Sequence, residues 1–196
     1  MFIVFEGLDG SGSSTHSRLL KENLEKNGQQ VAQTKEPTNL PIGKLIRQFL
    51  QHKHKTTEKA LQLLFAADRL DHLSKIIKPK QEEGKIVISD RYFFSSIAFG
   101  TLKSAEMFPW LEELYKDFPL PDMIFLLKVP PSECMKRIQK REQIEFFEQE
   151  EILKKVWKNY EKLANKYPDF HIIDGLKPKE DNAQTILNLV QKKLNN

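Results

Sequence analysis

The segment that most constrains the fold of this 196-residue chain is its N-terminus, where an apolar run leads through a glycine-rich turn into a helical pattern. The run 2–5 predicts a buried strand, and the pattern from Ser13 to Lys26, ended by Asn27-Gly28, predicts a helix. Such a turn points successive backbone N–H groups at one anion, and the helix adds the positive end of its dipole. The N-terminus therefore indicates a phosphate-binding unit made of a strand, a loop and a helix.

The glycine-rich turn, residues 7–15, nearly matches the phosphate-loop pattern G-x-x-x-x-G-K-[ST]. Gly7, Gly12 and Ser14 have the required spacing, but Ser13 stands at the lysine position. That lysine normally reaches the β- and γ-phosphates as a point charge, which backbone N–H groups replace only in part. Two interpretations stay open here: a phosphate loop with altered chemistry, or a glycine-rich turn that binds no ligand.

Short apolar runs alternate with helical patterns along the rest of the chain. Further strands are predicted at 30–34, 85–89, 123–127 and 170–173, and helices at 40–51, 58–81, 93–118, 131–166 with a polar interruption, and 180–194. This alternation predicts an α/β fold, a P-loop NTPase-like doubly wound parallel sheet of about five strands flanked by helices. With no internal repeat or interdomain linker, we expect a single domain over residues 1–196.

Composition restricts the setting in which the chain acts. No segment approaches the roughly 20 continuous apolar residues of a membrane span, and the first residues lack the features of a secretory signal. Cys134 is the only cysteine, so an intramolecular disulfide is excluded and we expect a reducing cytoplasm. The net charge of +4 comes from lysines interspersed with acidic residues, so an anionic small substrate explains it as well as nucleic acid does.

An acid and a guanidinium follow directly after the predicted strand 85–89, in Asp90-Arg91-Tyr92. This places them at the sheet edge where the glycine-rich turn also lies. A carboxylate there can hold Mg²⁺ through water, and an arginine can grip a phosphate with two hydrogen bonds. The alternative is a structural ion pair without a ligand.

Five segments taken together carry a resemblance to a known family. They are residues 5–10 (FEGLDG), 35–37 (KEP), 64–69 (LFAADR), 90–92 (DRY) with Ser95 and Phe99, and 121–122 (PD). In this order and at this spacing the chain resembles the thymidylate kinases over nearly its whole length. The resemblance implies a nucleoside-monophosphate kinase that uses ATP as co-substrate and Mg²⁺ as cofactor, and it implies a homodimer that binds neither nucleic acid nor a membrane.

The resemblance also implies a site for the acceptor dTMP. Its residues would be Asp9, Glu36, Phe65, Arg69, Arg91, Ser95 and Phe99. Asp9 would accept a hydrogen bond from the 3′-hydroxyl, Phe65 would stack on thymine beside Arg69, and Arg91 would bind the acceptor phosphate. Glu36 would lie near the magnesium, and Phe99 would close over the base or sugar. Phe65 and Phe99 also have helical spacing that suits core residues.

The donor side follows from the same resemblance. ATP would be bound by Gly7, Leu8, Asp9, Gly10, Ser11, Gly12, Ser13, Ser14 and Thr15, with Arg137 and Arg141. Mg²⁺ would be held by Ser14 and, through water, by Asp90. The catalytic residues would be Asp9, Arg91 and Arg141.

The basic run that ends with Arg141 corresponds in this family to a lid, here about residues 137–148, that closes on the donor. Some members of the family supply a catalytic arginine from the lid and others from the phosphate loop. Gly10 occupies that loop position here, so we expect the lid type, with Arg141 as the finger. Arg137, Lys140 and Arg141 would then take over part of the work of the absent lysine. A solvated basic helix face is the alternative.

Three other functions remain open from the sequence. Ser13 is compatible with a nucleotide-binding protein that keeps the fold and has lost catalysis. A kinase for another nucleoside monophosphate is the second alternative, and a nucleic-acid-binding protein is the third.

Overall fold

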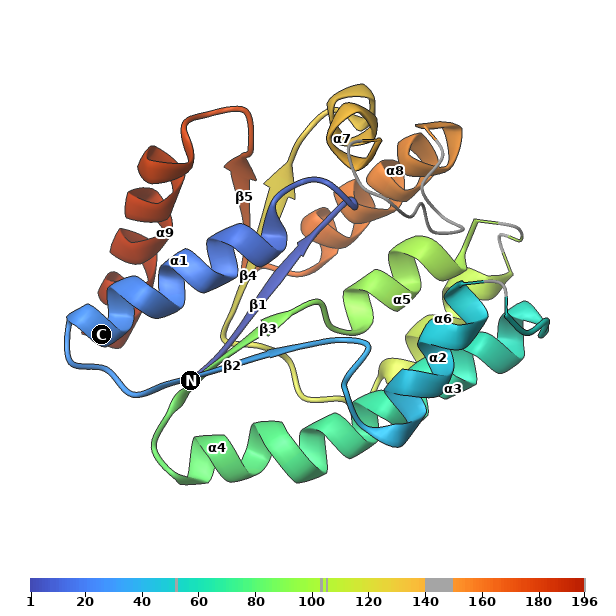
Figure 1. Cartoon of the computed structure of the whole chain (residues 1–196), viewed down its shortest axis with the longest axis horizontal. Helices are drawn as coiled ribbons and strands as arrows, with labels where there is room; N and C mark the ends of the chain where they lie inside the picture. Colours follow the sequence, from blue (N-terminus) through green and yellow to red (C-terminus); the bar gives the residue numbers. More distant parts are fainter. Residues whose placement is uncertain (52, 103, 105, 140–149, 196) are drawn as a thin grey trace.

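The structure is a computed structural model that describes residues 1–51, 53–102, 104, 106–139 and 150–195. A sheet of five parallel strands forms its centre, in the order β2-β3-β1-β4-β5 (Figure 1). The strands are β1 (Phe2–Gly7), β2 (Val31–Lys35), β3 (Ile86–Asp90), β4 (Met123–Lys128) and β5 (Phe170–Asp174). The predicted α/β fold with a parallel sheet is confirmed.

Successive side chains of a strand point to opposite faces of the sheet, and helices cover both faces. In β1, Ile3 and Phe5 join a cluster with apolar side chains of α1 (Ser13–Lys26) and α9 (Lys179–Leu194). Phe2 and Val4 join the other cluster, which includes side chains of α5 (Phe93–Gly100), α6 (Met107–Tyr115) and α8 (Glu150–Lys166). Two buried faces explain why the central strands β1, β3 and β4 are mostly apolar.

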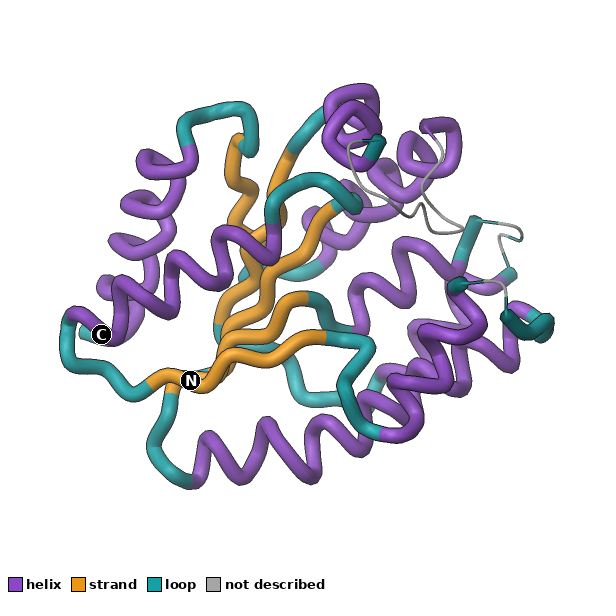
Figure 2. Tube along the Cα trace, in the orientation of Figure 1, coloured by secondary structure: helices purple, strands orange, loops and turns teal. Residues whose placement is uncertain are grey.

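The remaining helices form two groups (Figures 1 and 2). They are α2 (Pro41–Leu50), α3 (Glu58–His72), η1 (Leu73–Ile77) and α4 (Lys78–Glu82), which pack on one another in that order, and α7 (Pro131–Ile138), which packs on α8. The helix predicted at 13–26 matches α1 in both bounds. In the described part of the chain no helix is long and apolar enough to cross a membrane.

Two predicted helices are interrupted. The helix predicted over 58–81 contains the π-helical turn η1, which ends at Ile77, two residues before Pro79. Proline has no N–H and its ring clashes with the carbonyl four residues earlier, and a wider turn relieves that clash. The helix predicted over 93–118 ends at Gly100 and resumes at Met107, because α6 folds back onto α5. A Cβ on Gly100 would lie 2.8 Å from both Gln62 and Leu111.

The sheet brings the carboxyl ends of β1, β2 and β3 to one edge. The loop after β2 continues along this edge and is held by side chains of two helices. The backbone N–H of Thr38 donates to Asp68 of α3 at 2.8 Å, and Arg47 of α2 donates to the carbonyls of Pro37 and Thr38 at 2.6 Å each. Side chains of α2 and α3 thus fix the segment that follows β2.

A test of this packing is the substitution Gly43→Ala in α2. A Cβ at Gly43 would lie 2.1 Å from the carbonyl oxygen of Thr38, too close for any contact. Alanine favours a helix by up to about 1 kcal/mol over glycine, but the clash should outweigh that and lower the free energy of unfolding by about 1–3 kcal/mol. Urea unfolding measures this, with the exposed neighbour Lys44→Ala as the control. Equal stability of the two variants would contradict the close approach.

Candidate active site

The carboxylate of Asp90, at the end of β3, joins three elements at the phosphate loop. Ser13 Oγ donates to Asp90 Oδ1 at 2.9 Å, and Ser14 Oγ donates to Oδ2. Lys35 Nζ, from the end of β2, lies 3.2 Å from Oδ2. Burial alone would raise the pKa of Asp90, but the charges of Lys35 and Arg91 and the two hydroxyl donors outweigh it, so its pKa lies below the ordinary value. Asp90 is therefore an anion.

These oxygens form a suitable donor set for Mg²⁺. The ion usually binds one or two carboxylates together with substrate phosphates and waters. Asp90 supplies one carboxylate, and the Ser14 hydroxyl beside it supplies a further oxygen. Among the residues that the structure describes, no group of three or more histidines, cysteines and acids could hold a metal. The residues thus fit a metal ion that takes its remaining ligands from the phosphates of a nucleotide.

Arg91 lies between the phosphate loop and α5. Its guanidinium donates to Asp9 Oδ1 at 2.7 Å, to the carbonyl of Gly7 at 3.1 Å and to Ser95 Oγ at 2.9 Å. The backbone of Arg91 has a φ of 78°, a left-handed conformation that is uncommon outside glycine. Burial works against its charge, but Asp9 and other anionic neighbours raise the pKa of Arg91 above its ordinary value. The side chain is a fixed, permanently charged group beside the loop.

Another ion pair, this one buried, lies at the opposite wall, between the loop after β2 and α3. Arg69 Nε donates to Glu36 Oε2 at 2.6 Å, and both side chains are almost completely buried. His72 Nδ1 lies 2.8 Å from Glu36 Oε1, while its Nε2 lies 2.7 Å from Thr34 Oγ1. Burial would lower the pKa of Arg69, but the adjacent Glu36 raises it above the ordinary value. This pair ties α3 to the end of β2.

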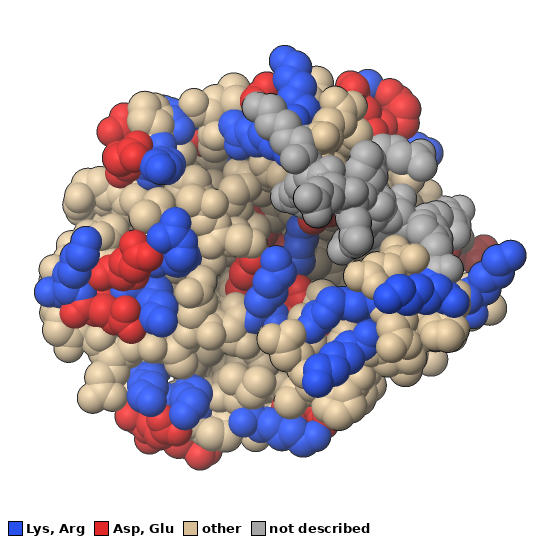
Figure 3. Space-filling view, in the orientation of Figure 1, with Lys and Arg blue, Asp and Glu red and all other residues tan. Residues whose placement is uncertain are grey.

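The two walls enclose a cavity of about 900 Å³. All seven residues predicted to bind the acceptor line it: Asp9, Glu36, Phe65, Arg69, Arg91, Ser95 and Phe99. Ser14 and Asp90 line it too. Figure 3 shows the hollow near the middle of the face, with basic and acidic side chains at its rim.

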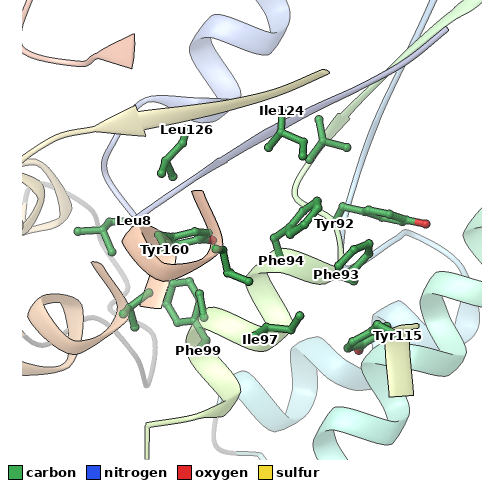
Figure 4. Packing of buried hydrophobic residues seen from close by; sticks show 14 of the residues in the cluster. Leu8, Tyr92, Phe93, Phe94, Ile97, Phe99, Tyr115, Ile124, Leu126 and Tyr160 are labelled. Carbon is green, nitrogen blue, oxygen red and sulfur yellow. The ribbon is translucent and has the colours of Figure 1, made fainter. Parts of the chain in front are cut away.

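Aromatic side chains contribute to both walls. Phe65 and Arg69 are four residues apart in α3, so they share one helix face. Phe99 is 8% exposed and packs near Tyr160 in the core (Figure 4), yet it also lines the cavity, with the Arg91 guanidinium 5.3 Å from its ring centroid. Phe99 therefore combines the core role and the cavity role that the sequence left as alternatives.

The phosphate loop itself is packed tightly on its outer side. A Cβ on Gly10, whose φ is 82°, would lie 2.7 Å from the carbonyl oxygen of Cys134 in α7. A residue with a side chain at position 10 would therefore clash with α7 in this conformation. Leu8 packs its side chain into the core, so its backbone is the part open to a ligand.

The predicted donor residues are not all brought together. Arg137 Nη1 lies 3.4 Å from the carbonyl of Gly10, and its Nε lies 3.4 Å from Glu133, so it is beside the loop. Arg137 does not line the cavity. Arg141, Lys140 and most of the predicted lid, about 137–148, lie outside the described residues. Of the predicted loop positions 7–15, only Asp9 and Ser14 line the cavity.

Sequence reasoning missed three side chains that shape the site. Glu6 is fully buried, and it accepts hydrogen bonds from the Tyr92 N–H at 2.9 Å and the Tyr160 hydroxyl at 2.7 Å. Its burial raises the pKa of Glu6 despite the nearby Arg91 and these donors. His72 and the cavity-lining Gln62, whose Oε1 is buried without a hydrogen-bond partner among the described residues, are the others. The contacts of these residues depend on partners that are distant in the sequence, so no local pattern indicates their part in the site.

A parallel sheet in this order, a glycine-rich loop leading into α1, and an acid hydrogen-bonded to the serines of that loop define a P-loop nucleotide-binding protein of the kinase type. Comparison with known proteins identifies the family within this class. The family model described as "Thymidylate kinase" matches residues 5–186. The chain belongs to the thymidylate kinase family.

Individual relatives agree with this assignment over their full length. A probable thymidylate kinase of Thermococcus onnurineus (strain NA1) is 44% identical over 99% of this chain and 98% of its own. One from Thermococcus kodakarensis is 42% identical over 97% of both chains. A putative thymidylate kinase of Treponema pallidum (strain Nichols) is 38% identical over 98% of this chain and 92% of its own.

The buried pair of Glu36 and Arg69 gives a stability test. Glu36→Ala should lower the free energy of unfolding by about 3 kcal/mol or more, because it leaves the Arg69 guanidinium buried without a counter-charge. Glu36→Gln keeps one acceptor oxygen and should be less damaging. Urea unfolding measures both variants. Asp71→Ala, which breaks the exposed pair with Lys75, is the control and should leave stability near that of the parent. A Glu36→Ala variant as stable as this control would contradict the assigned pair.

Proposed function

We propose that this chain transfers the γ-phosphoryl group of ATP to dTMP, giving dTDP and ADP. The observation that carries the proposal is the shared cavity, because it joins the Asp9–Arg91 pair at the phosphate loop to Phe65 and Arg69 on the facing helix. A site for a nucleoside monophosphate needs a cation at one end for the phosphate and an aromatic and polar wall at the other end for the base.

In this reaction the protein mainly aligns the two substrates and neutralises the charge of their phosphates. An oxygen of the dTMP phosphate attacks the γ-phosphorus, the bond from that phosphorus to the β,γ-bridging oxygen breaks, and ADP leaves with the electron pair. Arg91 would hold the acceptor phosphate in line, and Asp9 would accept a hydrogen bond from the 3′-hydroxyl. Asp90 and Ser14 would hold Mg²⁺, which when bound neutralises charge on the donor oxygens.

Base recognition is assigned to α3. Phe65 would stack on thymine, and Arg69, fixed by Glu36, would hydrogen-bond the base edge or the acceptor phosphate. Ser95 is tied to Arg91 and Glu6, so its part is to orient the arginine beside the substrate. Phe99 would cover the base or sugar from α5.

The wider setting is proposed on the same basis. ATP with Mg²⁺ is the donor, dTMP is the acceptor, and the enzyme acts in the cytoplasm as a homodimer without nucleic acid or membrane partners. Arg141 of the lid is the proposed catalytic arginine, with Arg137 beside the loop. One rival is favoured by a specific observation: Ser13, in place of the phosphate-loop lysine, would suit a protein that binds nucleotides without transferring phosphate.

A coupled assay of the purified protein with ATP, Mg²⁺ and each nucleoside monophosphate tests the proposal. The kcat/KM for dTMP should exceed those for dCMP, dAMP and dGMP, because stacking and the Arg69 contact select the base. Equal values for dTMP and a purine monophosphate would contradict the assigned base site. Tight ATP binding with no transfer to any acceptor would favour the non-catalytic rival.

A single substitution tests which side of the site binds the acceptor. Arg91→Ala should reduce kcat/KM for dTMP roughly 30-fold or more, which corresponds to a loss of about 2 kcal/mol in transition-state stabilisation. The reason is that it removes charge-assisted hydrogen bonds to the acceptor phosphate. Affinity for ATP, measured by calorimetry, should change much less. If ATP affinity fell and the use of dTMP did not, the donor and acceptor sides would be reversed.

A further inference from the structure

The absent lysine leaves a charge problem at the phosphate loop, which arises only if the chain binds a nucleoside triphosphate as proposed above. The loop offers backbone N–H groups and the dipole of α1, while Ser13 contributes a neutral hydroxyl that is already bonded to Asp90. A triphosphate is strongly anionic. Some side chain must bring positive charge to it from another element.

Lys35 is placed to do so. It is the last residue of β2 and is paired in register with Asp90 of β3. Its Nζ lies 3.2 Å from Asp90 Oδ2 and donates to Ser14 Oγ at 3.3 Å. Ser14 belongs to the first turn of α1 and follows Ser13 directly. The ammonium group of Lys35 therefore lies beside the first turn of α1.

The other described cations beside the loop are less suited. Arg91 is bound to Asp9, to Ser95 and to the carbonyl of Gly7, on the acceptor side. Arg137 lies over the outer side of the loop, near the carbonyl of Gly10, and does not line the cavity. Lys35 lines the cavity and its side chain is 60% exposed, so Nζ is free to leave Asp90 for a ligand.

We infer that Lys35 supplies, from the end of β2, the positive charge that a lysine at position 13 places on the donor phosphates in other phosphate loops. Without nucleotide its ammonium rests on Asp90. With ATP bound, Asp90 would be left to hold Mg²⁺, whose charge would replace that of the ammonium, and the flexible four-carbon stem of Lys35 would let Nζ reach the β- and γ-phosphates. The charge comes from a neighbouring strand instead of the helix.

Binding measurements test this without relying on activity. Lys35→Ala should weaken ATP binding by about 10- to 100-fold, the loss expected for charge-assisted hydrogen bonds. Calorimetry in Mg²⁺ should show this loss in full, whereas in EDTA the loss should be smaller, because without the metal Asp90 keeps Lys35 as its counter-charge. AMP lacks the β- and γ-phosphates, so its affinity should not change. Lys26→Ala, which removes an exposed lysine at the far end of α1, is the control and should bind ATP like the parent.

Restoring the lysine gives the second arm. Ser13→Lys should recover at least about tenfold in kcat/KM for ATP in a Lys35→Ala background and change the parent by less, because the two lysines would serve the same charge. Lys35→Arg should keep most ATP affinity. Additive effects of Ser13→Lys and Lys35→Ala, or a loss seen equally with AMP, would overturn the inference. Urea unfolding of each variant separates misfolding from lost binding.

The outcomes distinguish this inference from the proposed function. If the parent phosphorylates dTMP and Lys35→Ala binds ATP normally in EDTA and in Mg²⁺, the inference fails and the function stands. If the parent transfers no phosphate but loses ATP affinity selectively on Lys35→Ala, the function fails and Lys35 still holds the donor phosphates.

Discussion

The carboxylate of Asp90 is the interaction on which the arrangement of the site depends. Removing a carboxylate from water is costly unless its oxygens are paired, and Asp90 obtains its partners from α1 and from the neighbouring strand β2. These contacts fix the first turn of α1 against the ends of β2 and β3. The phosphate loop thus receives its position relative to the sheet from one buried charge.

The two walls of the cavity follow from this anchoring. Arg91 comes next after Asp90 and turns toward the loop, where Asp9 and Gly7 accept its hydrogen bonds. Glu36 comes next after Lys35 and turns toward α3, where Arg69 and His72 meet it. The ends of the neighbouring strands β2 and β3 therefore place charged residues at both walls of the cavity.

The sequence predicted the elements better than their contacts. Apolar runs such as Met123–Lys128 could be recognised because both faces of a parallel sheet are buried, and the helix Ser13–Lys26 ended at its Asn-Gly signal. The motifs predicted which side chains gather at one cavity, and their roles stay predictions. The ion pair of Lys35 with Asp90 depends on strand register, and the burial of Glu6 depends on Tyr160 in a distant helix. No local pattern encodes either.

If the neighbouring strand ends supply the cations for the two phosphates, Lys35 for the donor and Arg91 for the acceptor, both contacts should be visible in a crystal structure. The complex with Mg²⁺, dTMP and a non-hydrolysable ATP analogue is the one to solve. We expect Lys35 Nζ at hydrogen-bond distance, about 3 Å, from a β- or γ-phosphate oxygen, with Arg91 on the dTMP phosphate. A structure with Lys35 still on Asp90, or turned to solvent, while another side chain contacts those oxygens would contradict it.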